Sequence, residues 1–298
     1  MTDELREGVF SFYRKFYSSF WKDPRVRQRV LDYNVSTPPF KIYHLNDQRK
    51  LFTRILDHYL EEVVHIIKLI TPFGLSKKNV ILEIGGGLGL VYGYLKHHGY
   101  RIYSVEPSLA GFNDFFTAGQ ALFKIIGVDN RGWQPYKGAE VNKFKRRFDL
   151  IFSNNVLEHV DDLNGSFSVF KKVLKPKGLM VHNSANYLLP YDPHYKIFLF
   201  PFLERLTQLF RPELKPSTVW QDLNFSNAFV IYRLARKNGL AVKFLPHQLV
   251  AAIERLASDQ EFSYRHRKMK KHLLFLRLLT KLPPFLQTPM AVVLKHQT

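Results

Sequence analysis

The sequence predicts an α/β fold in which a doubly wound, mainly parallel sheet carries helices on both faces. The first observation is an apolar segment at 80–84, a glycine-rich turn at 85–89 and a helix beginning near Leu90. The second is that further strand-like segments, at 100–105, 179–183 and 240–245, alternate with segments of helical period. A chain of 298 residues with 46% hydrophobic content can bury the core of such a fold.

The first 75 residues are expected to form a helical extension ahead of the main domain at 76–298. Residues 10–22 alternate aromatic and basic side chains, and residues 49–70 carry apolar residues at steps of three and four. The second pattern is typical of an amphipathic helix. The first can bind nucleic acid, but a helix packed over the edge of the domain is the favoured interpretation.

The glycine-rich turn indicates a nucleotide site. Gly85, Gly87 and Gly89 permit positive φ angles and the close approach of a ligand, and the following helix directs free N–H groups at that ligand. The spacing is not the dinucleotide G-x-G-x-x-G, and no Gly-Lys-Ser/Thr closes a P-loop. Glu83 precedes the turn, and Glu106 ends the next strand, where a carboxylate can bind both hydroxyls of a ribose.

Glu83-x-Gly85-x-Gly87-x-Gly89 and Glu106 together resemble the class I S-adenosylmethionine-dependent methyltransferases. Two further segments follow in the family's order: a strand at 148–154 that leads into Asn155-Val-Leu-Glu-His159, and Leu-Lys-Pro-Lys-Gly before the strand at 179–183. The resemblance covers residues 80–183. It implies a Rossmann-like, seven-stranded sheet with an antiparallel last strand at 289–295, S-adenosylmethionine as the methyl donor and S-adenosylhomocysteine as the product.

The resemblance also implies roles for individual residues. Glu83 would orient the glycine loop or reach the donor's amino-acid group, and Glu106 would hold the ribose diol. Ser153 and Asn154 would lie near the sulfonium. Glu140 stands where family members often carry an acid that binds the adenine amino group. The full set of implied cofactor-binding residues is Glu83, Gly85, Gly86, Gly87, Gly89, Glu106, Pro107, Glu140, Ser153 and Asn154.

Two long segments, 185–222 and 246–288, are expected as lid-like insertions at the carboxyl edge of the sheet, where such folds bind ligands. The first contains Asp192 and His194, one of which is predicted to bind or deprotonate the acceptor. His159 is a second candidate base. The alternatives are that His194 forms hydrogen bonds inside a self-packed lid and that His159 caps its turn. No metal is expected, because a sulfonium is already an activated methyl donor and the chain has no cysteine.

The chain carries 44 Lys and Arg against 25 Asp and Glu, a net charge of +19 that attracts nucleic acid, anionic lipid or anionic substrates. In 265–281 a basic run precedes a Leu- and Phe-rich helix. This arrangement favours peripheral contact with anionic membrane lipid; the alternative is a basic cap that packs on the sheet. The absence of a signal-like N-terminus, of cysteines and of long apolar runs predicts a cytoplasmic protein, peripheral at the inner membrane face.

The expected function is methyl transfer from S-adenosylmethionine to a small molecule, either anionic or lipid-linked, such as a glycan or a lipid-linked intermediate at a membrane surface. An RNA methyltransferase and a non-catalytic, S-adenosylmethionine-binding regulatory module are the alternatives. Residues 153–156 read Ser-Asn-Asn-Val where enzymes that methylate amino groups of bases or proteins carry Asn/Asp-Pro-Pro-Tyr/Phe. This difference disfavours such acceptors.

Overall fold

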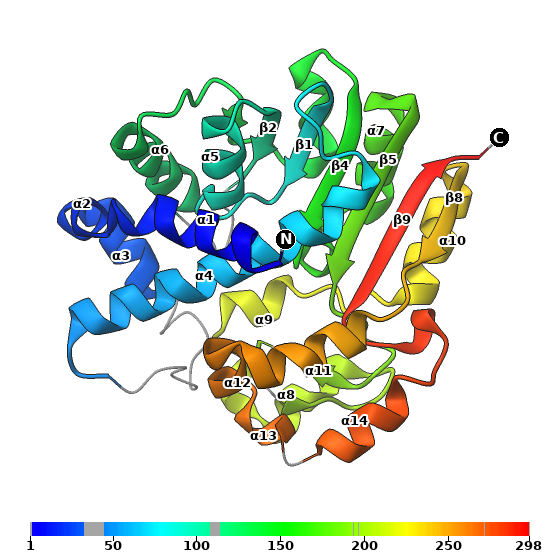
Figure 1. Cartoon of the computed structure of the whole chain (residues 1–298). Coiled ribbons are helices and arrows are strands. Elements are labelled where there is room, and N and C mark those ends of the chain that lie inside the picture. The colour runs from blue at the N-terminus through cyan, green and yellow to red at the C-terminus, as the bar shows by residue number, and fades with distance from the viewer. Residues whose placement is uncertain are drawn as a thin grey trace.

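A seven-stranded sheet with the strand order β3-β2-β1-β4-β5-β9-β8 forms the centre of the molecule (Figure 1). The structure is a computed structural model that describes residues 2–32, 45–107, 114–192, 194–195, 197–270 and 272–297. The strands are β1 (Val80–Ile84), β2 (Arg101–Val105), β3 (Trp133–Gln134), β4 (Phe148–Asn154), β5 (Leu174–Ser184), β8 (Leu240–Phe244) and β9 (Met290–His296). β9 is antiparallel to both of its neighbours, whereas the pairs from β3 to β5 are parallel, as predicted.

Helices cover both faces of this sheet and explain its continuous apolar strands. All five residues of β1 are buried, because a parallel strand inside such a sheet has no solvent-facing side. Ile81 packs in a core with the N-terminal helices, and Leu82 packs in a second core on the opposite face. The flanking helices are α5 (Leu90–His97), α6 (Phe115–Ile126), α7 (Leu163–Val173) and α10 (Ala228–Lys237).

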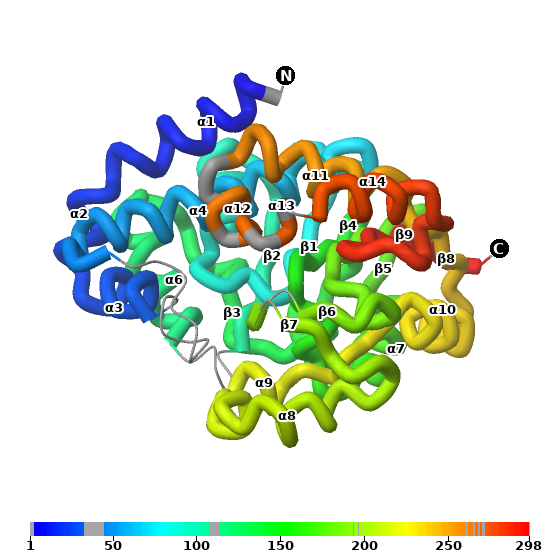
Figure 2. The backbone as a smooth tube through the Cα atoms, turned by 90° about the horizontal axis from the view of Figure 1, so that it is seen from below, coloured from blue at the N-terminus to red at the C-terminus, as the bar shows by residue number. Residues whose placement is uncertain are grey.

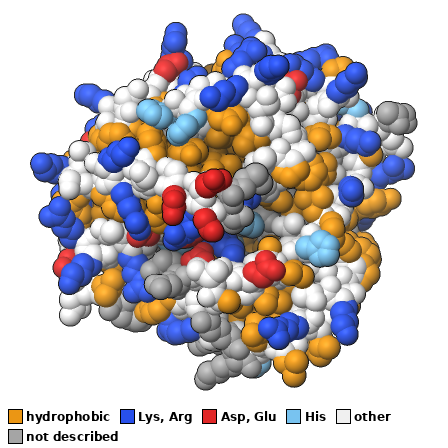
Figure 3. Space-filling model, in the orientation of Figure 1, with side chains coloured by type: hydrophobic (Ala, Val, Ile, Leu, Met, Phe, Trp, Pro, Cys, Tyr) orange, Lys and Arg blue, Asp and Glu red, His pale blue; other side chains and the backbone are white. Residues whose placement is uncertain are grey.

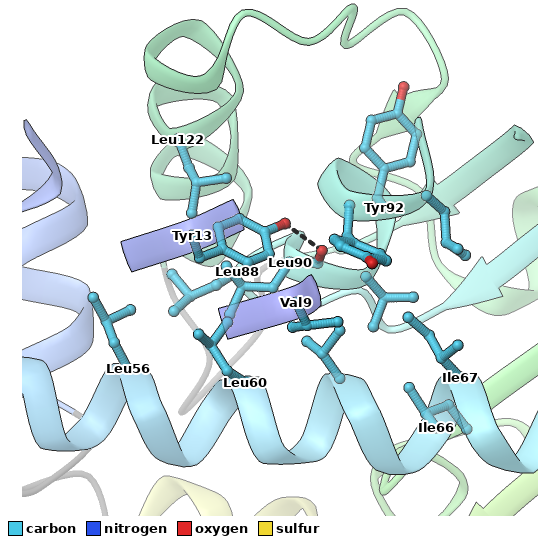
Figure 4. Packing of buried hydrophobic residues seen from close by; sticks show 14 of the residues in the cluster. Val9, Tyr13, Leu56, Leu60, Ile66, Ile67, Leu88, Leu90, Tyr92 and Leu122 are labelled. Atoms are coloured by element: carbon cyan, nitrogen blue, oxygen red, sulfur yellow. Dashed lines mark hydrogen bonds between the residues drawn. The ribbon is translucent and has the colours of Figure 1, made fainter. Parts of the chain in front are cut away.

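The N-terminal extension consists of α1 (Thr2–Arg14), α2 (Tyr17–Lys22), α3 (Pro24–Asp32) and α4 (Gln48–Ile70). Figure 4 shows Tyr13 of α1 and Leu60 of α4 packed against Leu88 and Leu90, next to the glycine turn. The Tyr13 hydroxyl donates a hydrogen bond to the Leu90 carbonyl. The extension therefore shares its core with the sheet. The aromatic residues of the first helices pack inward, as the favoured interpretation predicted.

Two boundaries differ from the sequence-based expectation. A helix was expected to end at Leu174 and to be closed by residues 175–178, but β5 already begins at Leu174 and pairs with β4 through a register shift between Phe148 and Leu150. The helix expected from residue 107 is described only from Phe115, because residues 108–113 lie outside the described part of the chain.

Both predicted insertions lie below the sheet in Figure 1, at the end toward which β4 and β5 point. The first contains the hairpin of β6 (Tyr191–Asp192) and β7 (Ile197–Phe198), then α8 (Thr207–Phe210) and α9 (Thr218–Asp222). It has its own small core around Tyr195, Leu214 and Trp220. The second contains α11 (Gln248–Ser258), α12 (Gln260–Arg265), α13 (Arg267–Lys270) and α14 (Leu273–Leu279). Among the described residues, no helix combines the length and apolarity required to cross a bilayer.

Candidate functional site

A cavity of about 800 Å³ lies at the carboxyl edge of the sheet, beneath the glycine turn. This volume falls in the range of about 300–1,000 Å³ that is common for small-molecule sites. Its walls come from the loops after β1, β2, β4 and β5, from α4 and from both insertions. The N-terminal extension and the two insertions thus enclose a single space over the sheet.

The glycine turn forms one end of this cavity. Gly87 has a φ of +55°, and a Cβ there would meet nothing within 4 Å, so the backbone borders open space. At Gly85, Gly86 and Gly89 a Cβ would instead collide with Val156, Ser104 and Phe123 side chains. Gly87 therefore leaves room for a ligand, whereas its neighbours allow the turn to pack tightly.

Two carboxylates stand beside this turn. Glu106 lines the cavity and accepts a hydrogen bond from the Gly87 N–H at 2.8 Å. Glu83 is also buried at the cavity and accepts a hydrogen bond from the Ser104 hydroxyl at 2.8 Å. Burial and the nearby charge of Glu106 raise the pKa of Glu83 to about 7, against the opposing effect of the Ser104 hydrogen bond. Acids at an open glycine turn fit a ligand with ribose hydroxyls and positive groups, as S-adenosylmethionine has.

Not every expected donor-binding residue reaches this cavity. Pro107 and Asn154 line it. The side chain of Ser153 is fully buried behind the wall, where its hydroxyl pairs with His182 Nδ1 at 2.8 Å. This placement follows from the alternation of side chains along β4, which sends Ser153 and Asn154 in opposite directions.

The structure does not bring Glu140 to the cavity. Its carboxylate accepts a hydrogen bond from the Lys137 N–H at 2.9 Å and pairs with Lys143 at 2.5 Å. These contacts close the first turn of the short 3₁₀ helix Gly138–Phe144. Lys137, Gly138 and Ala139 line the cavity instead, so this arrangement does not support an adenine contact from Glu140.

The three predicted catalytic residues lie next to one another in the structure. His159 ends the 3₁₀ helix Leu157–His159 after β4, and its Nε2 lies 3.3 Å from Nε2 of His194 in the first insertion. His194 Nδ1 lies 3.5 Å from a carboxylate oxygen of Asp192. Both imidazoles line the cavity.

Asp192 itself does not line the cavity, so direct contact with an acceptor is not supported by its placement. It is fully buried and accepts hydrogen bonds from the Tyr187 hydroxyl at 2.8 Å and the Tyr195 N–H at 2.7 Å. Burial raises the pKa of Asp192, but the adjacent His194 and these hydrogen bonds outweigh burial, and the net pKa is below the ordinary value. Asp192 is therefore an anion whose charge lies beside His194.

The electrostatics of His159 differ from those of Asp192. Burial lowers the pKa of His159 to about 3, with the neighbouring His194 adding to this effect and Asp192 opposing it. His159 is consequently uncharged at neutral pH and keeps a nitrogen lone pair available.

Sequence reasoning gave Glu158 no role, although it directly precedes His159. Glu158 is buried, lines the cavity and accepts a hydrogen bond from the Ser184 hydroxyl at 2.8 Å. Burial raises the pKa of Glu158, with His194 and the hydrogen bonds opposing that rise. The sequence feature that could have identified Glu158 is its position directly before His159, after the end of a predicted strand.

A buried ion-pair network, which the sequence did not predict, joins the second insertion to α4. Arg255 donates to Glu62 at 3.0 Å and to Asp259 at 2.9 Å. All three residues are mostly buried. Because Arg255 and Glu62 are 193 positions apart, no local pattern reveals the pair.

The second insertion also provides an apolar wall. Helices α11 and α14 contribute Leu249, Ile253 and Leu276, and Met269 of α13 joins them. In 265–281, His266 and Leu276 face the cavity, whereas Leu274 and Phe275 are 78% and 58% exposed. Part of this segment thus packs toward the cavity, and another part is exposed to solvent. The side chains at 265, 268, 270 and 271 lie outside the described part of the chain.

A seven-stranded sheet with a glycine turn and a carboxylate at its second strand defines the class of S-adenosylmethionine-dependent methyltransferases. Residues 46–243 match the family model described as a methyltransferase domain. The chain belongs to this family, which confirms the predicted fold, the predicted enzyme class and S-adenosylmethionine as its cofactor.

Curated relatives match parts of the chain. An uncharacterized protein of Mycobacterium tuberculosis strain H37Rv is 32% identical over 193 residues, which span 62% of this chain and 65% of the relative. The match thus covers slightly less than two thirds of that relative. A ubiquinone biosynthesis O-methyltransferase of Bradyrhizobium sp. strain ORS 278 is 28% identical over 108 residues, or 36% of this chain and 40% of the relative.

Solved structures resemble the chain at low sequence identity. The YcgJ protein of Bacillus subtilis is 15% identical, with a TM-score of 0.49, and the alignment covers 80% of this chain and all of that one. Phosphoethanolamine N-methyltransferase 2 of Haemonchus contortus, crystallised with S-adenosyl-L-methionine, is 16% identical, with a TM-score of 0.47 and coverage of 80% and 53%.

Proposed function

We propose that this protein transfers the methyl group of S-adenosylmethionine to a hydroxyl oxygen of a small, partly apolar acceptor that is lipid-linked or held at a membrane surface. The observation that carries the proposal is the shared cavity, which is lined both by Gly87 and Glu106 and by the paired imidazoles of His159 and His194. A donor and an acceptor bound in one enclosed space can be aligned for direct transfer.

The donor end of the cavity is assigned to Glu106, Gly87 and Asn154. Glu106 would bind the ribose hydroxyls, and the open backbone at Gly87 would border the donor. When bound, S-adenosylmethionine supplies a methyl group that its sulfonium already activates. The residues of the chain therefore need only hold the donor, align the acceptor and remove a proton.

His194 is assigned as the residue that accepts the acceptor's hydroxyl proton. Asp192, 3.5 Å from His194 Nδ1, would stabilise the imidazolium that forms when Nε2 gains this proton. His159, held uncharged by burial, would hydrogen-bond the hydroxyl or the neighbouring imidazole. The O-methyltransferase activity named for the Bradyrhizobium relative is consistent with an oxygen acceptor.

The acceptor end has an apolar wall, which favours an acceptor with a hydrophobic portion. Leu249, Ile253, Leu256, Phe262 and Leu276 all belong to the second insertion. Such a wall would bind the apolar part of the acceptor while the imidazoles receive its hydroxyl.

Exposed apolar side chains on both insertions support presentation at a membrane. Phe198 and Phe202 of the first insertion are 79% and 81% exposed, and Leu274 of α14 is 78% exposed. The remaining large exposed apolar residues of these segments are Phe200, Leu203, Leu206, Leu209, Phe210, Phe275 and Leu278. Seen from below in Figure 2, α8, the β6–β7 hairpin and α14 lie across one end of the molecule.

Basic residues accompany these apolar side chains. Figure 3, in the orientation of Figure 1, shows hydrophobic side chains among Lys and Arg side chains at the lower end of the molecule. Lys215, Arg267, Arg277 and Lys281 are exposed in the same segments. Apolar and basic groups together favour the surface of an anionic bilayer, and we place the protein peripherally at the cytoplasmic face.

Co-sedimentation with lipid vesicles tests the membrane contact. We expect the wild-type protein to pellet with phosphatidylglycerol vesicles and to remain in the supernatant with phosphatidylcholine vesicles. A Leu274→Ser/Phe275→Ser variant should lose this binding, whereas Tyr232→Ser, which removes a 48% exposed aromatic residue of α10, should keep it. Equal pelleting of all three proteins would contradict the assigned surface.

Methyl-labelled S-adenosylmethionine tests the chemistry. Incubation of the protein with a membrane lipid extract should place the label in the organic phase and release S-adenosylhomocysteine, and a His194→Ala variant should lose this transfer. Label that enters added RNA instead would overturn the proposed acceptor class. Donor binding without any release of S-adenosylhomocysteine would favour a non-catalytic module.

A further inference from the structure

We propose that Glu158, His159 and His194 form a binding site for one divalent transition-metal ion on the cavity wall. Each residue offers one ligand atom, and these three atoms lie within 4.8 Å of one another. All three residues line the cavity, so an ion there would keep a side open to bound molecules. The sequence predicted no metal, because a sulfonium is already activated and the chain has no cysteine, and it did not reveal that His194 lies next to the Glu158–His159 pair.

The distance between the two imidazoles suits a shared ion. His159 Nε2 and His194 Nε2 lie 3.3 Å apart. Metal–nitrogen bonds of about 2.0–2.1 Å at a tetrahedral angle place two ligand nitrogens about 3.3 Å apart. The competing arrangement is a hydrogen bond in which the N–H of one imidazole is donated to the other. Titration with Zn²⁺ distinguishes this hydrogen bond from a shared ion.

Neighbouring groups hold the ligands in the way that metal sites require. Asp192 lies behind His194, with its carboxylate oxygen 3.5 Å from Nδ1, and thereby directs Nε2 toward His159. Ser184 donates to Glu158 at 2.8 Å. Carboxylates and hydroxyls in these positions fix the tautomer and orientation of metal ligands.

The charge of the cluster also favours a cation. Glu158 is almost fully buried and, among the described residues, forms no ion pair with a Lys or Arg, whereas Asp192 has His194 and two hydrogen-bond donors as partners. The nearby buried acids Glu62 and Asp259, by contrast, share Arg255. Buried carboxylates require compensation by a partner or a metal.

Two imidazole nitrogens and one carboxylate oxygen select the class of ion. Such donors suit Zn²⁺, Fe²⁺, Co²⁺ or Mn²⁺ better than Mg²⁺ or Ca²⁺, which prefer oxygen ligands alone. The proton-accepting role assigned to His194 therefore applies to the metal-free protein, because with the ion bound Nε2 of His159 and of His194 are ligands. A hydroxyl coordinated to the ion would then be more acidic than a free one. This last role rests on the proposed function, whereas ion binding does not.

Calorimetric titration of the untagged, chelator-treated protein with Zn²⁺ tests the site. We expect one tight site in the wild type, at least 100-fold weaker binding in His159→Ala and His194→Ala, and about 10- to 100-fold weaker binding in Asp192→Asn. A His97→Ala/His98→Ala variant, which removes an exposed histidine pair on α5 and its end, should bind like the wild type. Mg²⁺ should bind more weakly than Zn²⁺.

Zn²⁺ binding that is equal in the wild type and in His194→Ala would overturn the proposal and leave the N–H bridge between the imidazoles. A wild type with no tight site would do the same. The S-adenosylmethionine affinity and circular dichroism of each variant show whether it is folded. If the alanine variants do not fold, the visible spectrum of the Co²⁺-loaded wild type decides, because absence of a spectrum with nitrogen ligation contradicts the site.

Discussion

Alanine substitutions at Gly87 and Gly89 should separate donor binding from stability within one turn. Both residues have positive φ, +55° and +75°, so an alanine at either position costs roughly 1–2 kcal/mol of backbone strain. At Gly89 the new Cβ would also lie 2.9 Å from Cε1 of Phe123, and such overpacking costs about 1–3 kcal/mol more. The expected loss of stability is therefore roughly 2–5 kcal/mol at Gly89 but only about 1–2 kcal/mol at Gly87.

Ligand binding should show the opposite order. At Gly87 the added Cβ points into space that is empty of protein atoms, beside the Glu106 carboxylate. If this space holds the donor, a clash of about 1–3 kcal/mol in the bound state weakens S-adenosylmethionine binding roughly 5- to 150-fold.

Urea unfolding and calorimetric titration of both variants measure the two effects. The reasoning is refuted if folded Gly87→Ala binds S-adenosylmethionine as tightly as the wild type. It is also refuted if Gly89→Ala loses no more stability than Gly87→Ala. Either result would mean that the open space at Gly87 is not the donor site or that the turn is not tightly packed against Phe123.

Two further predictions concern charge. The pKa of His159 is lowered to about 3 in the folded protein, so this imidazole gains its proton in the unfolded chain before it does in the folded one as the pH falls. The free energy of unfolding should therefore decline as the pH falls below about 6.5. Urea midpoints measured across this pH range should fall less steeply in a His159→Gln variant. Replacing Arg255 with Met removes the guanidinium that Glu62 and Asp259 share and should cost about 3–5 kcal/mol of unfolding free energy. An additional Glu62→Gln change should restore part of that loss, and a stability unchanged by Arg255→Met would show that the network contributes nothing.

Local patterns explain why the glycine turn and Glu106 lie together at the cavity. The glycine turn, its strand and Glu106 are close in sequence, and the parallel pairing of β1 with β2 places Glu106 beside the turn. Glu140 shows where such reasoning fails. Its position matches the family's pattern, but contacts within 137–143 capture its carboxylate for helix capping.

The acceptor end depended on tertiary contacts. His159, Asp192 and His194 were each identified as candidates, but the 3.3 Å approach of two imidazoles 35 residues apart is set by how the first insertion folds back over β4. The same limit hid the role of Glu158 and the pairing of Arg255 with Glu62. The sequence therefore identifies candidate functional residues, whereas their grouping in space depends on how the insertions fold.

Calorimetric titration of S-adenosylmethionine into the wild type, Glu106→Ala and Glu140→Ala tests the central claim most directly. Glu106 borders the cavity beside Gly87, whereas Glu140 is engaged outside it. Loss of a hydrogen bond from a charged, buried group costs about 1.5–3 kcal/mol, so Glu106→Ala should bind roughly 10- to 100-fold more weakly. Glu140→Ala should bind like the wild type. Unchanged affinity in Glu106→Ala, or an equal loss in Glu140→Ala, would contradict the assignment of this cavity as the methyl-donor site.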